Sequence, residues 1–336
     1  MRVKISDIAK LAGVSNAAVS LALNNKEGIS DETREKILNI AQSLNYMAND
    51  NARNLKVKRT FKIGVVITDI RNPFFATLVD ELSIEAKKRG YILQIALSND
   101  VIEKEQEAIK TFVSNNVDGV IVIPTIDVNI RDMSHLLLLK NLKIPFVFCT
   151  SAYVGFEEPC VMTDLAQGEY ELVKHLIDRG KRKIFFVTGD SSLLLSKMRI
   201  QGYKKAFEDS GYEYSKDWII ETTPYYDSGY EQAKMIWSKK PDAVITVNDF
   251  VAMGLIKGFK DIGVKVPEDI NVAGYDDLLF SSLIETTLTT VKQPIHDICN
   301  KTLELLIDEI DNYGNKENYK GFYFLEPKLE VRESTN

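Results

Sequence analysis

Carboxylates, amides and aromatic side chains recur directly after short apolar segments in most of this 336-residue chain. The apolar segments have the length of buried parallel strands, and ligands bind at the carboxyl ends of such strands. Carboxylate and amide groups can hydrogen-bond paired hydroxyls, and aromatic rings can cover an apolar ring face. These residue types therefore indicate a site for a sugar or another polyhydroxylated molecule. The positions concerned are 69–75, 99–100, 125, 127, 150–151, 190–191, 225–227, 248–249 and 275–277.

Two other interpretations apply to these polar residues. Asp and Asn are common in turns and at helix N-caps, so any single one can be structural. Catalysis is not indicated, because the sequence has no phosphate-binding glycine loop, HExxH, GxSxG or CxxC motif. The three histidines, His135, His175 and His296, are far apart, and we expect each to be a surface or helix-face residue. We expect no enzyme, no cofactor and no metal site.

The first part of the chain has a different pattern. Apolar residues recur every three or four positions on both sides of Gly13, which predicts two short helices within residues 4–24. Glycine allows the left-handed backbone of a helix exit, and Ser15 can cap the second helix. This is the helix-turn-helix pattern, whose second helix enters the DNA major groove, although other three-helix bundles contain such turns. Ser30 is the expected cap of a third helix.

The distribution of charge supports contact with DNA at one end only. The net charge is −6, which alone argues against a nucleic-acid binder. Residues 1–60 nevertheless carry ten Lys and Arg against six Asp and Glu, a balance of +4, and the remainder carries −10. A small basic segment joined to an acidic body fits a protein that meets phosphates with its first residues.

The first part of the sequence also resembles the headpiece of the LacI/GalR family of bacterial transcription regulators. The matching segments read I-x-D-I-A-x-x-A-G-V-S-x-x-x-V-S-x-x-L-N, I-S-x-x-T-R-E-K-I and L-N-Y. The resemblance implies a DNA-binding headpiece at 1–48 and a hinge at 49–60, with Leu55 wedged into the minor groove. A disordered linker is the other interpretation of the hinge segment. The DNA-binding residues implied are Ser6, Ser15, Asn16, Ala17, Ser20, Asn24, Ser30, Thr33, Asn49, Ala52 and Leu55.

Strands and helices alternate from Phe61 onward, which predicts parallel sheets covered on both faces. These residues are too many for one core, and the alternation pauses around 150–163, so we expect two lobes. The predicted strands are 62–69, 91–97, 118–124, 144–149, 183–188, 218–222, 242–247 and 271–275. The predicted helices are 74–90, 103–115, 131–141, 165–180, 196–211, 228–239, 249–262 and 295–312. The fold class is thus an all-α helix-turn-helix headpiece followed by an α/β core with two doubly wound parallel sheets.

The family resemblance implies a periplasmic-binding-protein-like core at 61–336, in which the chain crosses between lobes near 160, 291 and 321. Lobe 1 would comprise about 61–160 and 292–320, and lobe 2 about 161–291 and 321–336. On this basis the helix at 295–312 completes lobe 1, and a last strand at 322–325 completes lobe 2. The effector-binding residues implied are Asn72, Phe74, Phe75, Thr125, Asp164, Arg199, Tyr226, Asn248, Asp249 and Asp276.

The function implied is that of a homodimeric, sequence-specific repressor on a near-palindromic double-stranded DNA operator. A small-molecule effector, a carbohydrate by expectation, would bind between the lobes and control operator affinity. The alternative is a solute-binding receptor for a sugar without a gene-regulatory role. We expect a cytoplasmic protein without membrane contact, because the sequence shows neither a signal peptide nor a long apolar run. Cys149, Cys160 and Cys299 are expected to be buried free thiols.

Overall fold

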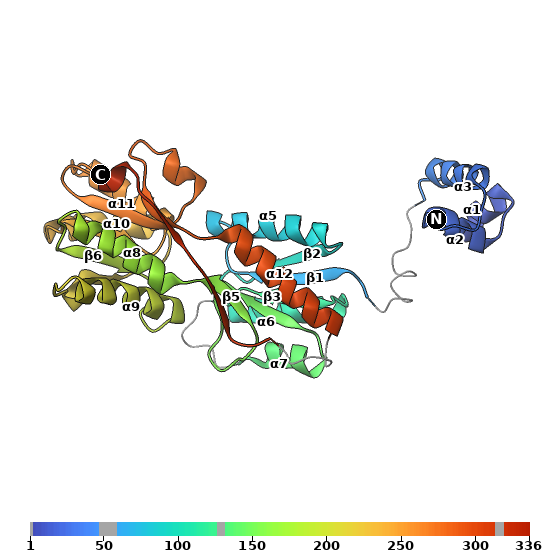
Figure 1. The fold of residues 1–336 in the computed structure, drawn as a ribbon, viewed down its shortest axis with the longest axis horizontal. Coiled ribbons are helices and arrows are strands. Elements are labelled where there is room, and N and C mark those ends of the chain that lie inside the picture. The colour runs from blue at the N-terminus through green and yellow to red at the C-terminus, as the bar shows by residue number, and fades with distance from the viewer. Residues whose placement is uncertain (1–2, 47–58, 126–131, 313–318) are drawn as a thin grey trace. The chain divides into compact units, whose positions relative to one another are not determined.

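The computed structural model describes residues 3–46, 59–125, 132–312 and 319–336 (Figure 1). The chain separates into two compact units, Met1–Thr60 and Phe61–Asn336. None of the described helices combines the length and the apolar character that a membrane span requires. All three cysteines are free and buried, as predicted.

The first unit contains three short helices, α1 (Ile5–Ala12), α2 (Asn16–Leu23) and α3 (Asp31–Ser43). Gly13 ends α1 with φ +70°, which confirms the predicted left-handed exit. The Ser15 hydroxyl accepts a hydrogen bond from the Ala18 N–H at 3.2 Å, and Ser30 caps α3 in the same way. The predicted helix-turn-helix and third helix are therefore confirmed. Their small core consists of Ile8, Ala9, Ala12, Val19, Ala22, Ile37 and Ala41.

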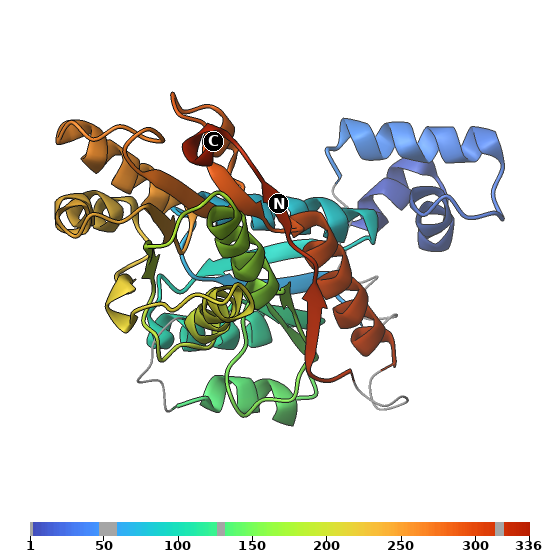
Figure 2. The ribbon, with the colours of Figure 1, turned by 60° about the vertical axis from the view of Figure 1, so that its left-hand side comes forward.

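The second unit contains two six-stranded sheets, each the centre of one lobe (Figures 1 and 2). The sheet of the first lobe has the order β11-β5-β4-β3-β1-β2, and all of its pairings are parallel. Its strands are β1 (Lys62–Ile67), β2 (Ile92–Leu97), β3 (Gly119–Val122), β4 (Phe146–Cys149), β5 (Cys160–Thr163) and β11 (Phe322–Leu325). The predicted parallel sheet is confirmed, while the strand β5 was not predicted.

The sheet of the second lobe has the order β12-β10-β9-β8-β6-β7. Its strands are β6 (Ile184–Thr188), β7 (Ile219–Glu221), β8 (Ala243–Thr246), β9 (Asn271–Asp276), β10 (Thr289–Lys292) and β12 (Lys328–Glu330). Only the pairing of β12 with β10 is antiparallel in this sheet. The sequence analysis missed β10 and β12, which are three or four residues long.

Helices cover both faces of each sheet, because the central strands are apolar on both sides. In the first lobe, α5 (Pro73–Lys88) and α12 (Ile295–Asn312) pack together, and α6 (Ile102–Ser114) packs with α7 (Ser134–Asn141). In the second lobe, α8 (Leu165–Asp178) pairs with α9 (Leu194–Asp209), and α10 (Tyr226–Ser238) pairs with α11 (Asp249–Asp261). One hydrophobic cluster runs from the α6–α7 side of the first lobe to the α8–α9 side of the second.

The chain passes between the lobes three times, after β5, after β10 and after β11. The strand predicted at 322–325 exists, but its assignment to the second lobe was wrong. Phe322–Leu325 pairs with Cys160–Thr163 in the first sheet, so the third crossing follows Leu325 rather than residue 321. The physical reason is pairing: β11 completes the edge of the first sheet beside β5, and β12 does so in the second beside β10. The helix α12 belongs to the first lobe, as predicted.

Candidate DNA-binding surface and effector site

The helix α2 presents an exposed face of small and polar residues in the first unit. Asn16, Ala17 and Ser20 are exposed, whereas Val19 and Ala22 face the small core. Asn24 follows the helix, and its side-chain amide donates to the Ser20 carbonyl at 2.8 Å. Side chains at the start of such a second helix are free to reach base edges in the major groove.

The other residues predicted to contact DNA have several locations. Ser6 is exposed on α1. The Ser30 and Thr33 hydroxyls lie 2.8 Å apart at the start of α3, where Ser30 also caps the helix. A helix start favours anions, so these hydroxyls are suitably placed for a phosphate. Asn49, Ala52 and Leu55, together with the hinge helix, lie outside the described residues.

In the second unit, hydrogen bonds join the strand ends of the two lobes. Gln293 lies between β10 and α12. Its carbonyl accepts a bond from the Thr163 hydroxyl of the first sheet at 2.6 Å, and its amide donates to Asp276 of the second sheet at 2.6 Å. A second link joins the Tyr225 hydroxyl to Asp69 at 3.4 Å. The carboxyl ends of both sheets therefore face each other, which is where ligands bind to open α/β sheets.

Arg199 is the central cation of this region. It is 6% exposed, its guanidinium lies 3.7 Å from the centre of the Tyr275 ring, and one nitrogen is 3.3 Å from Glu169. Burial raises the pKa of Glu169 to about 7, although the guanidinium opposes that rise. One Glu169 oxygen is buried without a partner among the described residues. The arginine thus has guanidinium donors beside a polar strand end, as recognition of a hydroxyl or an anion requires.

Asp276 is a buried carboxyl near Arg199, and Asp249 is a second buried carboxyl near Asp276. Burial raises the pKa of Asp276 to about 8, and the nearby charge of Asp249 adds to the rise. Asp276 has a φ of +112°, a backbone conformation that L-residues rarely adopt. Such strain persists only where the surroundings hold it, and it is common at binding sites.

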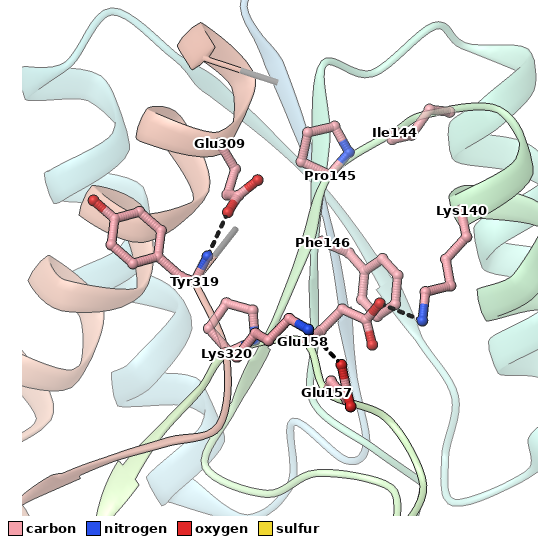
Figure 3. Close-up of a pocket in the computed structure, with 10 residues that line it drawn as sticks. Lys140, Ile144, Pro145, Phe146, Glu157, Glu158, Glu309, Tyr319 and Lys320 are labelled. Atoms are coloured by element: carbon pink, nitrogen blue, oxygen red, sulfur yellow. Dashed lines mark hydrogen bonds and ion pairs between the residues drawn. The ribbon is translucent and has the colours of Figure 1, made fainter. Parts of the chain in front are cut away.

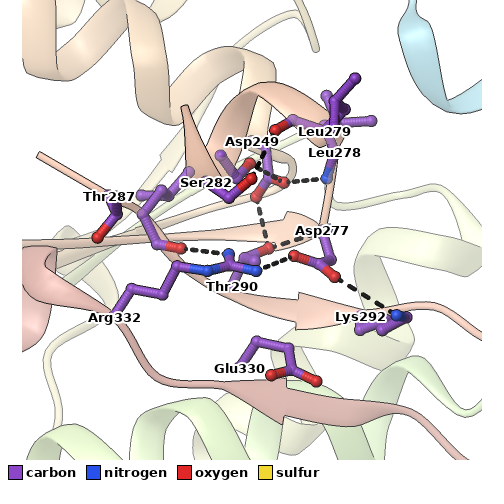
Figure 4. Close-up of polar contacts among 12 residues, drawn as sticks. Asp249, Asp277, Leu278, Leu279, Ser282, Thr287, Thr290, Lys292, Glu330 and Arg332 are labelled. Atoms are coloured by element: carbon purple, nitrogen blue, oxygen red, sulfur yellow. Dashed lines mark hydrogen bonds and ion pairs between the residues drawn. The ribbon is translucent and has the colours of Figure 1, made fainter. Parts of the chain in front are cut away.

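The network around Asp249 shows what holds this strand end (Figure 4). Asp249 is fully buried and accepts bonds from the Thr290 hydroxyl at 2.5 Å, the Ser281 hydroxyl at 2.6 Å and the Leu278 N–H at 2.8 Å. Arg332, on the segment that follows β12, forms an ion pair with Asp277 at 2.6 Å. Both oxygens of Asp249 are therefore occupied by the chain itself, so the structure gives this predicted effector residue a supporting position.

The predicted residue Thr125 also belongs to a buried network, in the first lobe. Its N–H and hydroxyl donate to Glu105 at 2.9 and 2.8 Å, and the Tyr153 hydroxyl donates to the same carboxylate at 2.9 Å. His135 bonds the other Glu105 oxygen at 2.8 Å. His135 was predicted to be a surface or helix-face residue; it lies on the helix α7, but its side chain is fully buried and not at the surface. The helix α7 carries His135 on its inner side, where Nε2 of the ring bonds Glu105 of α6, while Nδ1 is buried without a partner among the described residues.

The remaining predicted effector residues are near the same strand ends, with different roles. Asn72, Asp164 and Asn248 are the N-caps of α5, α8 and α11, which is the structural role that such residues often have. Phe74 is buried, and Phe75 is half-buried. Tyr226 packs against Phe250 and lines a cavity on the outer side of α11. Its neighbour Tyr225 was not among the predicted effector-binding residues, yet its hydroxyl bonds Asp69 of the first lobe.

Sequence reasoning missed Glu105, Glu169 and Gln293. The two glutamates had a detectable signal, because each lies on the apolar stripe of its helix. Glu169 falls in register with Leu165, Leu172 and Leu176 of α8, all of them buried. An acidic residue at a core position requires a buried partner. Gln293 had no such signal, because its role depends on the crossing between the lobes.

One group of described residues has the composition of a metal site. Donor atoms of Glu81, Glu85 and His296 lie within 4.8 Å of one another. Lys88 and Arg89 already bond Glu85 and hold its pKa at about 2. Two positive charges thus occupy the space where a cation would bind, so this group is better explained as a network of surface ion pairs.

Comparison with known proteins assigns both units to one family. Residues 4–49 match the model of bacterial regulatory proteins of the lacI family, and residues 60–320 match the periplasmic binding proteins and sugar binding domain of the LacI family. The chain is 32% identical to catabolite control protein A of Priestia megaterium over the full length of both. It is 30% identical to the HTH-type transcriptional repressor PurR of Vibrio vulnificus, with 98% of each chain covered.

Solved structures agree with this assignment. The lac repressor dimer bound to operator and an anti-inducer has a TM-score of 0.85 at 24% identity, covering 100% of this chain and 99% of the other, and shows a common fold. The complex of the regulator CelR with cellobiose has a TM-score of 0.73 at 26% identity, covering 99% and 100%. A regulator from Enterococcus faecium with bound ribose has a TM-score of 0.71 at 27% identity, covering 81% and 98%. The chain belongs to the LacI family of bacterial regulatory proteins, and it is a sequence-specific DNA-binding transcription regulator.

Proposed function

We propose that this regulator is a homodimeric repressor whose affinity for a near-palindromic operator is set by a carbohydrate bound between its two lobes. The observation that carries the proposal is the Thr163–Gln293–Asp276 bridge beside Arg199, where polar strand ends of both lobes meet. A ligand with several hydroxyls can replace these bonds and change the angle between the lobes. Relatives that are named for ribose and crystallised with cellobiose support a sugar as the effector.

Within this proposal, Arg199, Asp276 and Phe74 are the main ligand-contacting residues. Arg199 would donate to ligand oxygens, and Asp276 would accept from ligand hydroxyls once its bond to Gln293 is exchanged. Phe74 would cover the apolar face of the sugar ring. Asp164, Asn72, Phe75, Thr125, Tyr226 and Asn248 remain proposed contacts, and Asp249 is proposed to act by holding the 276–278 segment.

The proposed dimer is supported by exposed apolar residues on two elements of the second unit. Ile92 and Ile95 are 70% and 46% exposed on β2, which is an edge strand of the first sheet. Leu279 and Leu283 are 72% and 67% exposed after β9. Exposed apolar groups of this size mark an interaction surface, and a second copy of the chain fits a protein that binds a palindrome. Replacing Ile92 and Leu279 by Asp is expected to give a monomer in sedimentation velocity experiments.

Thermal unfolding of the full chain with ribose, cellobiose and related sugars tests the effector. A true ligand at 100 times its dissociation constant stabilises the folded state by about 2.7 kcal/mol. The Arg199→Lys variant should lose most of this effect, because one ammonium cannot replace the planar guanidinium fork. Lys197→Arg, two residues away and exposed on the same helix, is the matched control. Equal stabilisation of wild type and Arg199→Lys by every binding sugar would contradict the proposed site.

A duplex selected from a random DNA pool tests the headpiece. Asn16→Ala should weaken binding to the selected duplex by about 1–3 kcal/mol and relax the preference at one base position in each half-site. Asn39→Ala, an exposed residue on α3, is the control and should bind as the wild type does. Unchanged sequence preference in Asn16→Ala would show that α2 does not read the bases in the proposed way.

A further inference from the structure

A cavity of about 270 Å³ lies in the first lobe, at the edge of the sheet opposite to the candidate effector site (Figure 3). The neighbouring strands β4, β5 and β11 begin there, and the segments leading into them line the cavity. Ligand pockets have volumes of about 300–1,000 Å³, so this cavity fits a small metabolite.

The walls of the cavity supply apolar surface on several sides. Pro145 and Phe146 lead into β4, and Pro159 precedes β5. Figure 3 shows Tyr319 and Glu309 on one wall, with Phe146 and Lys140 on the opposite wall. Phe146 itself is buried, and its ring packs edge-on against Phe148 of the core. A ring or short alkyl body between these walls would lose water on both faces.

Glu158 provides the polar feature that points to a ligand. Its side chain is 16% exposed, and one oxygen pairs with Lys140 at 2.6 Å. The other oxygen, Oε2, is buried, and none of the described residues donates a hydrogen bond to it. A buried acceptor without a donor is costly, and a carboxylate forms its strongest bonds with charged donors. A ligand that carries N–H groups would satisfy this oxygen once the carboxylate rotates toward the cavity, because Oε2 is buried in the present conformation.

The charges around the cavity favour a cation. The described residues of its lining include three glutamates and two lysines, a formal balance of −1. Both lysines are already paired, Lys140 with Glu158 and Lys320 with Glu157, each at 2.6 Å. Glu309 adds a third carboxylate, one oxygen of which accepts from the Tyr319 N–H at 2.9 Å. The lining therefore has an unbalanced negative charge, and its cations are occupied.

We propose that this cavity is a second ligand site, which takes a small primary amine with an aromatic or short apolar body. The ammonium donates to Glu158 Oε2, and the body packs between Phe146, Pro145 and Tyr319. The site is separate from the effector site, because it lies at the amino ends of the strands whose carboxyl ends face the second lobe. Amine binding there is independent of the proposed sugar.

Calorimetric titration of the full chain with three probes tests the proposal. Benzylamine, benzyl alcohol and benzoate share one ring and differ in charge. We expect saturable binding of benzylamine, with affinity at least tenfold higher than that of either other probe. Equal binding of the alcohol, or no saturation by the amine at millimolar concentration, would overturn the proposal.

Amino-acid substitutions test whether benzylamine binds in this cavity. Glu158→Gln should weaken benzylamine binding at least tenfold, because the acceptor charge is lost, and its unfolding temperature establishes that the variant is folded. Glu158→Asp retracts the carboxylate without removing its charge and should weaken binding to a smaller extent. Glu157→Gln is the matched control, since Glu157 is 75% exposed, and should bind within twofold of the wild type. Lys140→Met removes a competing cation and should bind more tightly. Full affinity in Glu158→Gln would contradict the assignment to this cavity.

Discussion

Asp69 in the first lobe and Asp249 in the second both follow the carboxyl end of a buried parallel strand, yet their carboxyl groups differ. Arg71 bonds Asp69 and lowers the pKa of that carboxyl. Asp249 is bonded by two hydroxyls and one N–H, and burial raises its pKa to about 7. The same local sequence pattern therefore yields opposite protonation behaviour, because the depth of burial and the nearest cation decide it.

The contrast extends to the two lobes. The strand ends of the first lobe satisfy their acids locally, by Arg71 in one network and by His135, Thr125 and Tyr153 in another. The second lobe places Glu169 and Asp276 near one arginine and Asp249 near Asp276, and burial raises the pKa of all three carboxyls. Protons or ligand hydroxyls can relieve this excess of buried negative charge. The second lobe is thus the more responsive half of the proposed effector site.

The largest expected effect comes from removing the central cation of the second lobe. Arg199→Met leaves Glu169 and Asp276 buried without their positive neighbour, and this should cost about 3–5 kcal/mol in the free energy of unfolding. Urea denaturation measures it. Arg71→Met is the matched change in the first lobe, where the arginine side chain is 78% exposed and solvent takes over its role, so the loss should be much smaller. Equal losses would remove the distinction between the lobes.

Close helix packing beside Arg199 gives the next effect. A Cβ at Gly202 of α9 would lie 2.0 Å from the Ala166 carbonyl oxygen of α8. Gly202→Ala should therefore push the two helices apart and cost about 1–3 kcal/mol in the free energy of unfolding. Gln201→Ala, at the exposed neighbouring position, is the control, and urea denaturation compares the two. A neutral Gly202→Ala would show that α8 and α9 can separate without loss.

These contrasts also show what the sequence could and could not predict. Caps and apolar periodicity are local, so Gly13, Ser15 and Ser30 identified the headpiece helices. The polar strand ends were found for the same reason. Lobe membership is not local: Phe322–Leu325 was misassigned because only the pairing with β5 places it.

The burial of polar side chains is the second property that the sequence could not predict. The burial of His135, expected only to be a surface or helix-face residue, could not be predicted because its partner, Glu105, lies 30 residues earlier in the chain. Gln293 escaped notice because its two partners, Thr163 and Asp276, come from different lobes. Local patterns thus predicted the elements and the edge of the sheet where the site lies, and tertiary pairing decided which side chains satisfy one another.

The pH dependence of stability should separate the two aspartates. A carboxyl whose pKa is raised on folding binds protons more tightly in the folded state, so its stabilisation is lost as pH rises from about 4 to about 7. Asp249→Asn should remove up to about 1.4 kcal/mol per pH unit of this fall. The pKa of Asp69 is lowered on folding, so its carboxylate stabilises the fold at pH values above the pKa of the unfolded chain. Asp69→Asn should therefore reduce stability mainly above about pH 4. Urea denaturation between about pH 2 and about pH 8 measures both slopes, that of Asp69 below about pH 4 and that of Asp249 above it, and slopes of the same sign would refute the contrast.

The smallest expected effect concerns the hydrogen bond between Tyr225 of the second lobe and Asp69 of the first lobe. The Tyr225 hydroxyl donates to Asp69 at 3.4 Å, and Arg71 lies 5.9 Å from the centre of the Tyr225 ring. Tyr225→Phe removes the long hydrogen bond, keeps the ring contact, and should change the free energy of unfolding by less than about 1 kcal/mol.

The consequence for ligand binding should be larger than the consequence for folding. If this bond holds the lobes together, Tyr225→Phe should bind a stabilising sugar with altered affinity while its urea midpoint stays near that of the wild type. Tyr230→Phe is the control, because the Tyr230 hydroxyl bonds Asp261 within the second lobe. Identical sugar affinity in Tyr225→Phe and the wild type would mean that lobe closure depends on Gln293 alone. Among the described residues, the bridge between Thr163 and Asp276 would then be the link at the strand ends through which the proposed effector acts.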